Sequence, residues 1–224
     1  MNNNAIARPC YVGPSDLSQC SGVVYEAVVC DVSGSMSVEA FEPGKSKRKT
    51  MCRAGKRFLE AKLVYRPQDF VAVIGYESTA TLCCDFLNVG DDYAGIRFAF
   101  KEVKTLASGG TEMAKGLQIA HDLIRRLHVD SHRGPNLVRV LAYTDGHDGT
   151  TRRALRIAGE LKARGVLVET FGVAKSPTEV GEAFLQKVAT QDENGFIHYR
   201  FLGDAEAIHE TFQSLARDSL TYTE

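Results

Sequence analysis

Residues 25–42 read YEAVVCDVSGSMSVEAFE, and the middle of this stretch decides how the chain is interpreted. An apolar run leads directly into Asp31, and from there every second residue carries a side-chain oxygen: Asp31, Ser33 and Ser35. Gly34 separates the two serines and allows a tight turn. A buried strand that ends in three evenly spaced oxygens predicts a ligand-holding loop, and the rest of the chain must complete its site.

Length and composition indicate an ordinary soluble globular protein. The 224 residues are 44% apolar and 25% charged, which suits a single domain with a sizeable core. The formal net charge of −1 gives no overall attraction to nucleic acid or to an anionic membrane. No apolar run approaches the roughly 20 residues that span a bilayer, and the first residues do not resemble a secretion signal. We therefore expect a cytoplasmic protein.

Strand-like and helix-like segments alternate along most of the chain. Residues 1–22 are polar and aperiodic, which predicts a flexible leader, and residues 23–224 are expected to form one domain. The apolar runs 23–30, 70–76, 80–86, 137–143, 166–173 and 196–201 predict strands, and the segments 53–65, 93–103, 113–127, 152–164, 178–189 and 204–217 predict helices. This alternation predicts an α/β fold, a doubly wound and mostly parallel sheet with helices on both faces. The hairpin 70–76/80–86 adds one antiparallel edge strand.

Further oxygens are expected at the edge where Asp31 lies. Asp145, in LAYTDG (141–146), ends a strand, and Thr111 follows the Gly109-Gly110 turn. In an open α/β sheet, ligands bind beyond the carboxyl ends of the strands. Two carboxylates and three hydroxyls suit a hard divalent cation, Mg²⁺ or Mn²⁺, and an open coordination position on it would attract an outside carboxylate.

These three motifs together resemble those of the von Willebrand factor A-type domain. D-x-S-x-S at residues 31–35, GGT at 109–111 and TDG at 144–146 match its metal-ion-dependent adhesion site (MIDAS), and the resemblance covers about residues 23–217. It implies a sheet of about six strands and metal-dependent protein binding. It also implies a stand-alone cytoplasmic adaptor or assembly factor whose partner, a separate protein, presents an exposed Asp or Glu. The implied metal ligands are Asp31, Ser33, Ser35, Thr111 and Asp145.

The surroundings of the predicted metal site suggest a partner-binding rim. The long connection 38–52 carries Lys45, Lys47, Arg48 and Lys49, which are either a mobile, solvated charge run or a basic loop that steers an acidic partner. His147 and Asp148 directly follow the TDG motif and are expected to line the docking surface rather than to bind the metal.

Three alternatives remain open from the sequence. Thr111 could simply cap the helix that follows it. Phosphatases of the haloacid-dehalogenase type also place Asp at a strand end near Mg²⁺, but their second Asp is a general acid, and here that position is Ser33. A metal-free scaffold would leave two nearby carboxylates repelling each other.

Overall fold

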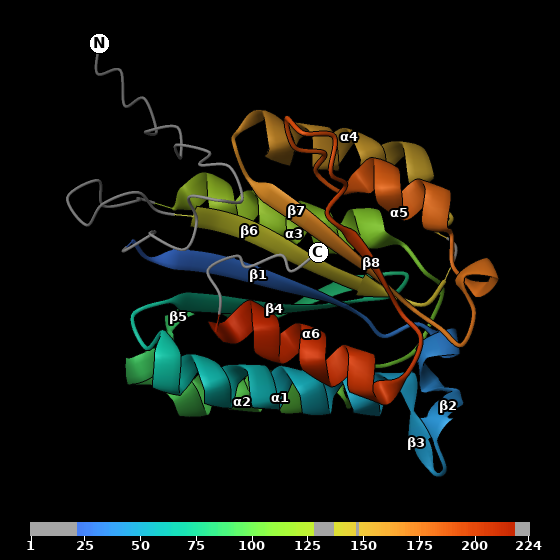
Figure 1. The fold of residues 1–224 in the computed structure, drawn as a ribbon, viewed down its shortest axis with the longest axis horizontal. Coiled ribbons are helices and arrows are strands. Elements are labelled where there is room, and N and C mark those ends of the chain that lie inside the picture. Colours follow the sequence, from blue (N-terminus) through green and yellow to red (C-terminus); the bar gives the residue numbers. More distant parts are fainter. Residues whose placement is uncertain (1–21, 128–136, 147, 218–224) are drawn as a thin grey trace.

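A six-stranded sheet forms the centre of the molecule (Figure 1). The computed structural model describes residues 22–127, 137–146 and 148–217, so the predicted leader, apart from Gly22, lies outside the described residues. The strand order is β5-β4-β1-β6-β7-β8, and only β5 runs antiparallel to its neighbour. This confirms the predicted sheet with its antiparallel edge. The strands are β1 (Val24–Asp31), β4 (Phe70–Tyr76), β5 (Ala80–Asn88), β6 (Leu137–Thr144), β7 (Leu167–Val173) and β8 (Tyr199–Leu202).

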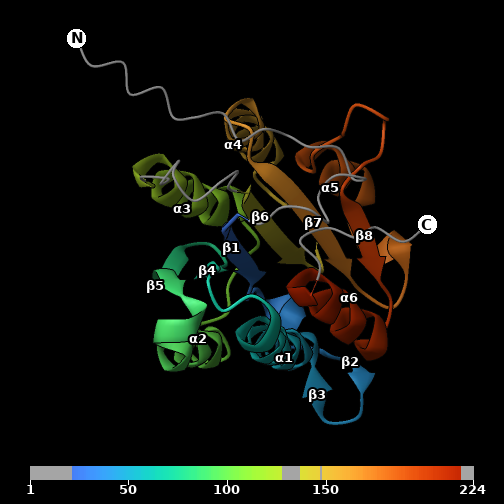
Figure 2. The ribbon, with the colours of Figure 1, turned by 60° about the vertical axis from the view of Figure 1, so that its left-hand side comes forward.

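Helices cover both faces of the sheet (Figures 1 and 2). On one face lie α1 (Lys47–Tyr65), α2 (Val89–Val103) and α6 (Ala205–Arg217); on the other lie α3 (Met113–Arg126), α4 (Thr151–Ala163) and α5 (Glu182–Val188). Side chains alternate across a strand, so Val28 and Cys30 of β1 pack towards the first group, and Ala27 and Val29 towards the second. The central strands are therefore apolar on both sides, as their sequences indicated.

The segment between β1 and α1 differs most from the prediction. A short antiparallel hairpin, β2 (Glu39–Glu42) and β3 (Lys45–Ser46), turns at Gly44, whose φ is 72°. Helix α1 then begins at Lys47 rather than at Arg53, because the Ser46 hydroxyl accepts the Lys49 N–H (3.3 Å) and caps it. The prediction that 38–52 is a long connection ahead of the helix was wrong, because the hairpin and the first turns of α1 occupy it. Short 3₁₀ turns follow β1 (Gly34–Ser37) and β7 (Pro177–Glu179).

Buried charges lie beneath α1 and α6, near the amino ends of the strands. They are Glu26, Lys62, Asp69, Arg139 and Glu169. The Arg139 guanidinium donates to Glu26 Oε1 (2.6 Å from Nε), Glu169 Oε1 (3.3 Å from Nη1) and the Leu215 carbonyl (2.7 Å from Nη2). Lys62 Nζ lies 2.5 Å from both Glu26 and Asp69. We call these five side chains the buried charge network; it joins three strands to both helices.

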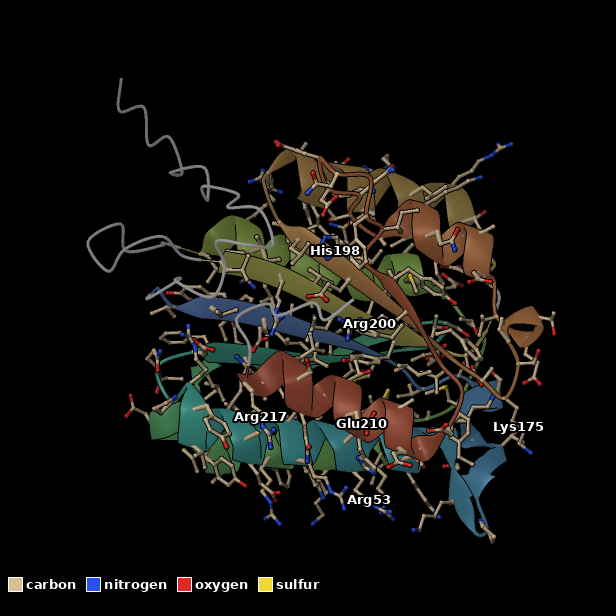
Figure 3. The ribbon with its side chains drawn as sticks, in the orientation of Figure 1. Arg53, Lys175, His198, Arg200, Glu210 and Arg217 are labelled. Carbon is tan, nitrogen blue, oxygen red and sulfur yellow. The ribbon has the colours of Figure 1, made fainter. Side chains whose placement is uncertain are left out.

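The α1–α6 layer is charged on its outer side. Figure 3 shows Arg53 extending from α1, and Glu210 and Arg217 on α6. The Arg217 guanidinium lies 5.7 Å from the centre of the Tyr65 ring at the end of α1, a cation–π contact between the two helices. Among the helices of the described ranges, none is both long and apolar enough to cross a membrane.

Candidate metal centre at the carboxyl edge of the sheet

Backbone hydrogen bonds hold three segments together at the carboxyl edge. The Gly34 N–H, in the loop after β1, donates to the Gly109 carbonyl (3.0 Å). The Glu112 N–H donates to the Glu77 carbonyl (3.1 Å), which ties the same 107–112 segment to the β4–β5 turn. The chain returns to this edge before α3, as the sequence predicted.

The absence of a side chain at Gly109 leaves room for the side chains of the β4–β5 turn. A Cβ there would overlap with the Glu77 carboxylate and lie 2.8 Å from Ser78 Oγ. At the next residue, the Gly110 N–H donates to Ser78 Oγ (2.8 Å). The β4–β5 turn thus fixes the position of the segment that carries Thr111.

Hydrogen bonds connect the predicted ligands of the β1 loop with the end of β6. Ser35 Oγ donates to Asp145 Oδ1 (2.7 Å) and lies 3.0 Å from Ser33 Oγ. Asp31 Oδ1 accepts the Ser33 N–H (2.8 Å), and Asp31 Oδ2 accepts the Thr144 hydroxyl (2.6 Å). Four of the five predicted ligand side chains are therefore brought into one small cluster. Thr144, which orients Asp31, was missed by the sequence reasoning although it is the first residue of TDG.

Asp31 is a strongly desolvated carboxyl. Burial, the largest cause, raises its pKa from 3.8 to about 6, and the negative charge of Asp145 acts in the same direction. Hydrogen bonds from Ser33 and Thr144 partly offset this rise by favouring the charged form. A nearby cation would favour that form further, so the environment of Asp31 suits a positively charged ligand.

Thr111 supplies the fifth side chain, which lies near Gly146. A Cβ built on Gly146 would lie 3.7 Å from both Thr111 Oγ1 and Ser35 Oγ, so both hydroxyls lie close to this glycine. The first N–H of α3, on Met113, donates to Asp148 Oδ2 (3.1 Å). Because Asp148 caps α3, the structure does not support the alternative that Thr111 serves as the cap.

Replacing Thr111 by valine is expected to weaken Mn²⁺ binding roughly tenfold, the size of effect seen when a group beside a metal is removed. The melting temperature of the ion-free protein is expected to change little, because the volume is kept and the half-buried hydroxyl does not cap α3. Calorimetric titration and thermal melts measure the two effects. A variant that loses stability as much as affinity would point to a purely structural role for this hydroxyl.

The basic residues predicted for the rim occupy different environments. Lys47 is buried, and its ammonium lies 2.7 Å from Asp145 Oδ2. Arg48 Nη1 donates to the Leu106 carbonyl (2.9 Å), and Lys45 is half-buried in β3. Only Lys49 among these four is exposed. They do not form a mobile basic loop, because the hairpin and the first turn of α1 fix them.

Asp148 has a structural role at this edge. It is 8% exposed, its Oδ2 accepts the Met113 N–H, and its Oδ1 accepts the Thr150 hydroxyl (2.6 Å). It therefore links the starts of α3 and α4, and the partner-facing position expected for it does not agree with this burial. His147 lies outside the described residues.

The donor set determines which ion fits. Among the described residues, no group of three or more His, Cys, Asp or Glu side chains is placed to hold a metal ion. A metal at this edge would be held by two carboxylates, by hydroxyls and by water, which is the coordination that Mg²⁺ and Mn²⁺ prefer. Asp31, Ser33, Ser35, Thr111 and Asp145 fit such an ion.

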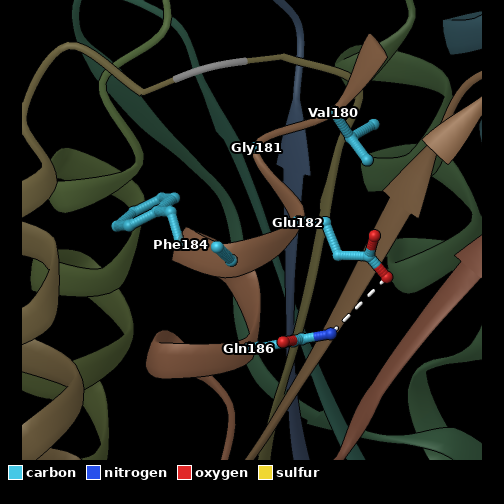
Figure 4. A pocket seen from close by; sticks show the side chains of 6 residues that line it. Val180, Gly181, Glu182, Phe184 and Gln186 are labelled. Carbon is cyan, nitrogen blue, oxygen red and sulfur yellow. Dashed lines mark hydrogen bonds between the residues drawn. The ribbon is translucent and has the colours of Figure 1, made fainter. Parts of the chain in front are cut away.

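A surface hollow near the start of α5 is a weaker candidate. Figure 4 shows it lined by Val180, Gly181, Glu182, Phe184 and Gln186. The Gln186 amide donates to Glu182 Oε1 (3.5 Å). A single carboxylate already bonded within its own helix offers little to a ligand.

Comparison with solved structures supports the fold. A von Willebrand factor type A protein from Catenulispora acidiphila has a TM-score of 0.64 at 20% identity, over 89% of this chain and 43% of that one. The vWF domain of the type V pili tip protein Mfa5 from Porphyromonas gingivalis has a TM-score of 0.66 at 13% identity, over 91% and 98%. Proximal thread matrix protein 1 from the mussel byssus, with a zinc-occupied MIDAS motif, has a TM-score of 0.64 at 19% identity, over 88% of this chain and 46% of that one.

Two of these three solved chains are more than twice as long as the part that this protein matches, so it spans 43% and 46% of them. A search of curated proteins found no match. The family model of the von Willebrand factor type A domain matches residues 27–147, which is more than half of the chain and includes all three motifs. The chain therefore belongs to the von Willebrand factor type A domain family.

Proposed function

We propose that this domain is a metal-dependent protein-binding module. The observation that carries the proposal is the convergence of two carboxylates and three hydroxyls at the carboxyl edge of the sheet. Asp31 bonds to Ser33, Ser33 lies beside Ser35, and Ser35 bonds to Asp145, with Thr111 nearby. Mg²⁺ or Mn²⁺ would bind among these oxygens as in a MIDAS. When bound, the ion would supply a positive charge that accepts an anionic oxygen from outside. The zinc-occupied MIDAS of the byssus protein supports a divalent ion at the corresponding edge.

The partner is a separate protein that presents an exposed Asp or Glu. Two carboxylates nearly neutralise a divalent ion, so its open position favours an anionic oxygen over a neutral one. The pilus tip and byssus proteins among the structural neighbours belong to protein assemblies, which is compatible with protein binding. A cytoplasmic location and an adaptor role are part of the proposal; the first is expected from the sequence, and the second is implied by the family resemblance.

The hydrolase alternative is not favoured at this site. A phosphatase mechanism of the D-x-D type needs a proton donor two residues after Asp31. Ser33 occupies that position, is 1% exposed, and lies at hydrogen-bond distance from Ser35. A serine hydroxyl is too weak an acid for that role.

The experiment is affinity capture with the wild-type chain and with Asp31→Asn, each in Mg²⁺ and in EDTA. A partner that uses the metal is expected only with the wild type in Mg²⁺. Changing the partner's central carboxylate to its amide is expected to remove the interaction as EDTA does. Asp122→Asn, on the exposed side of α3, is the matched control and is expected to behave as the wild type. A partner retained equally in EDTA would rule out a metal bridge.

A further inference from the structure

The Lys47 ammonium lies in the candidate metal centre itself. It is 2.7 Å from Asp145 Oδ2, and Ser35 Oγ is 2.7 Å from Asp145 Oδ1. Both carboxylate oxygens of Asp145 are thus held by side chains from the segment that follows β1. The hairpin β2–β3 brings Lys47 to this position, since the Lys47 N–H donates to the Val38 carbonyl (3.2 Å) at the base of the hairpin.

The position of Lys47 in α1 is unfavourable for a cation without such a partner. The amino end of a helix carries partial positive charge, which disfavours basic residues there. Helix α1 nevertheless begins with Lys47, Arg48 and Lys49 and has no acidic residue in its first turn. Both partners are shielded from water, since the Lys47 side chain is 11% exposed and the Asp145 side chain is fully buried. The ion pair with Asp145 therefore provides the negative charge that this helix end lacks.

The charges explain what the pairing does for the metal centre. Asp31 and Asp145 repel each other, and the Lys47 ammonium offsets part of that repulsion when no ion is present. With Lys47 in place, the two carboxylates and the ammonium leave one net negative charge for a divalent ion. Without the ammonium there would be two, so the attraction for an ion would be greater.

We propose that Lys47 is an internal cation that competes with the divalent ion for Asp145. Loading of the ion releases the ammonium from Asp145, and this exchange sets the affinity of the centre. The inference rests on the proposed function and adds to it a residue outside the MIDAS ligand set that controls occupancy.

The first test compares Mn²⁺ affinities of Lys47→Met and Lys49→Met by calorimetric titration. Lys47→Met is expected to bind Mn²⁺ at least about tenfold more tightly than the wild type, because a unit charge beside a ligand oxygen is removed. Lys49→Met removes the same charge from an exposed site two residues further along α1. This variant is expected to change the affinity for Mn²⁺ less than about twofold. Lys47→Gln serves as a second variant if the methionine variant does not fold. Equal or weaker binding by the folded Lys47 variant overturns the inference.

The second test measures access to the Lys47 amine in the wild-type chain. Labelling with an amine-reactive reagent, read by mass spectrometry, is expected to rise at Lys47 when Mn²⁺ is added and to stay constant at Lys49. The rise should be absent in Asp31→Asn. Mn²⁺ binding by the wild type without any change at Lys47 overturns the inference but leaves the proposed function intact. If none of the chains binds Mn²⁺, both fail; if only Lys47→Met binds it, the internal cation is supported.

Discussion

Replacing Arg139 by methionine is expected to lower the free energy of unfolding by about 3–5 kcal/mol, the cost of breaking a buried ion pair by removing one partner. Arg139 is 1% exposed, and its guanidinium lies between Glu26 and Glu169, which are themselves buried. Methionine fills similar space but leaves carboxylates in a poorly solvated environment. It also removes the donor to the Leu215 carbonyl of α6. Urea unfolding followed by circular dichroism measures the change.

Arg156→Met is the matched control for this variant. Arg156 also pairs with a glutamate, Glu160, but it is 58% exposed on α4. Such surface pairs contribute little, so a loss below about 0.5 kcal/mol is expected. If Arg139→Met were as mild as Arg156→Met, the buried charge network would not stabilise this fold.

The second large effect concerns the ion. Mg²⁺ or Mn²⁺ at about 100 times its dissociation constant is expected to raise the melting temperature of the wild type by roughly 5–10 °C, because it binds the folded state. Asp31→Asn is expected to abolish this increment. The amide can still accept the Ser33 N–H and can donate to Thr144, so the loop geometry is expected to persist. Thermal melts with and without the ion give the result.

The ion-free melting temperature of Asp31→Asn provides an internal check. The pKa of Asp31 in the folded state, about 6, is above its usual value of 3.8. The ion-free protein therefore loses stability as the pH rises from about 4 to about 6 and this carboxyl ionises. Asparagine carries no such penalty, so at neutral pH the ion-free variant is expected to be at least as stable as the wild type. A variant that melts lower but still responds to the ion would place the metal elsewhere.

Sequence periodicity predicted the sheet and most of the helices because the strands are apolar on both faces and the helices on one. It also predicted that Asp31 and Asp145 share an edge, since Asp31 directly follows one apolar strand run and Asp145 follows another after Thr144. Helix starts were less predictable. Ser46 and Asn88 cap α1 and α2, the latter by accepting the Gly90 and Asp91 N–H groups, and both helices begin earlier than expected. Capping residues are common in loops, so they mark a helix start only once the following turn is known.

The roles of single charged residues were not predictable from local sequence. Glu26, Arg139 and Glu169 each interrupt an apolar run, which was a usable signal for buried pairing, but the pairing depends on strand register. Lys47 looked like one member of a solvated basic segment. Its contact with Asp145 joins residues 98 positions apart and depends on the hairpin before α1. Such contacts follow from tertiary structure rather than from residue type.

Strand β1 places the buried charge network and the candidate metal centre near its two ends. Glu26 and Asp31 are five residues apart on this strand, or about 16 Å at 3.3 Å per residue. Perturbations separated by more than about 7–10 Å usually act additively. Sequence changes around Arg139 should therefore alter how much of the protein is folded but not how strongly each folded molecule holds its ion. Changes around Asp31 should alter the affinity for the ion and, where the ion is present, remove only the stability that its binding supplies. The stability of the ion-free fold and the affinity of the folded molecule for its ion can thus change separately within one sheet.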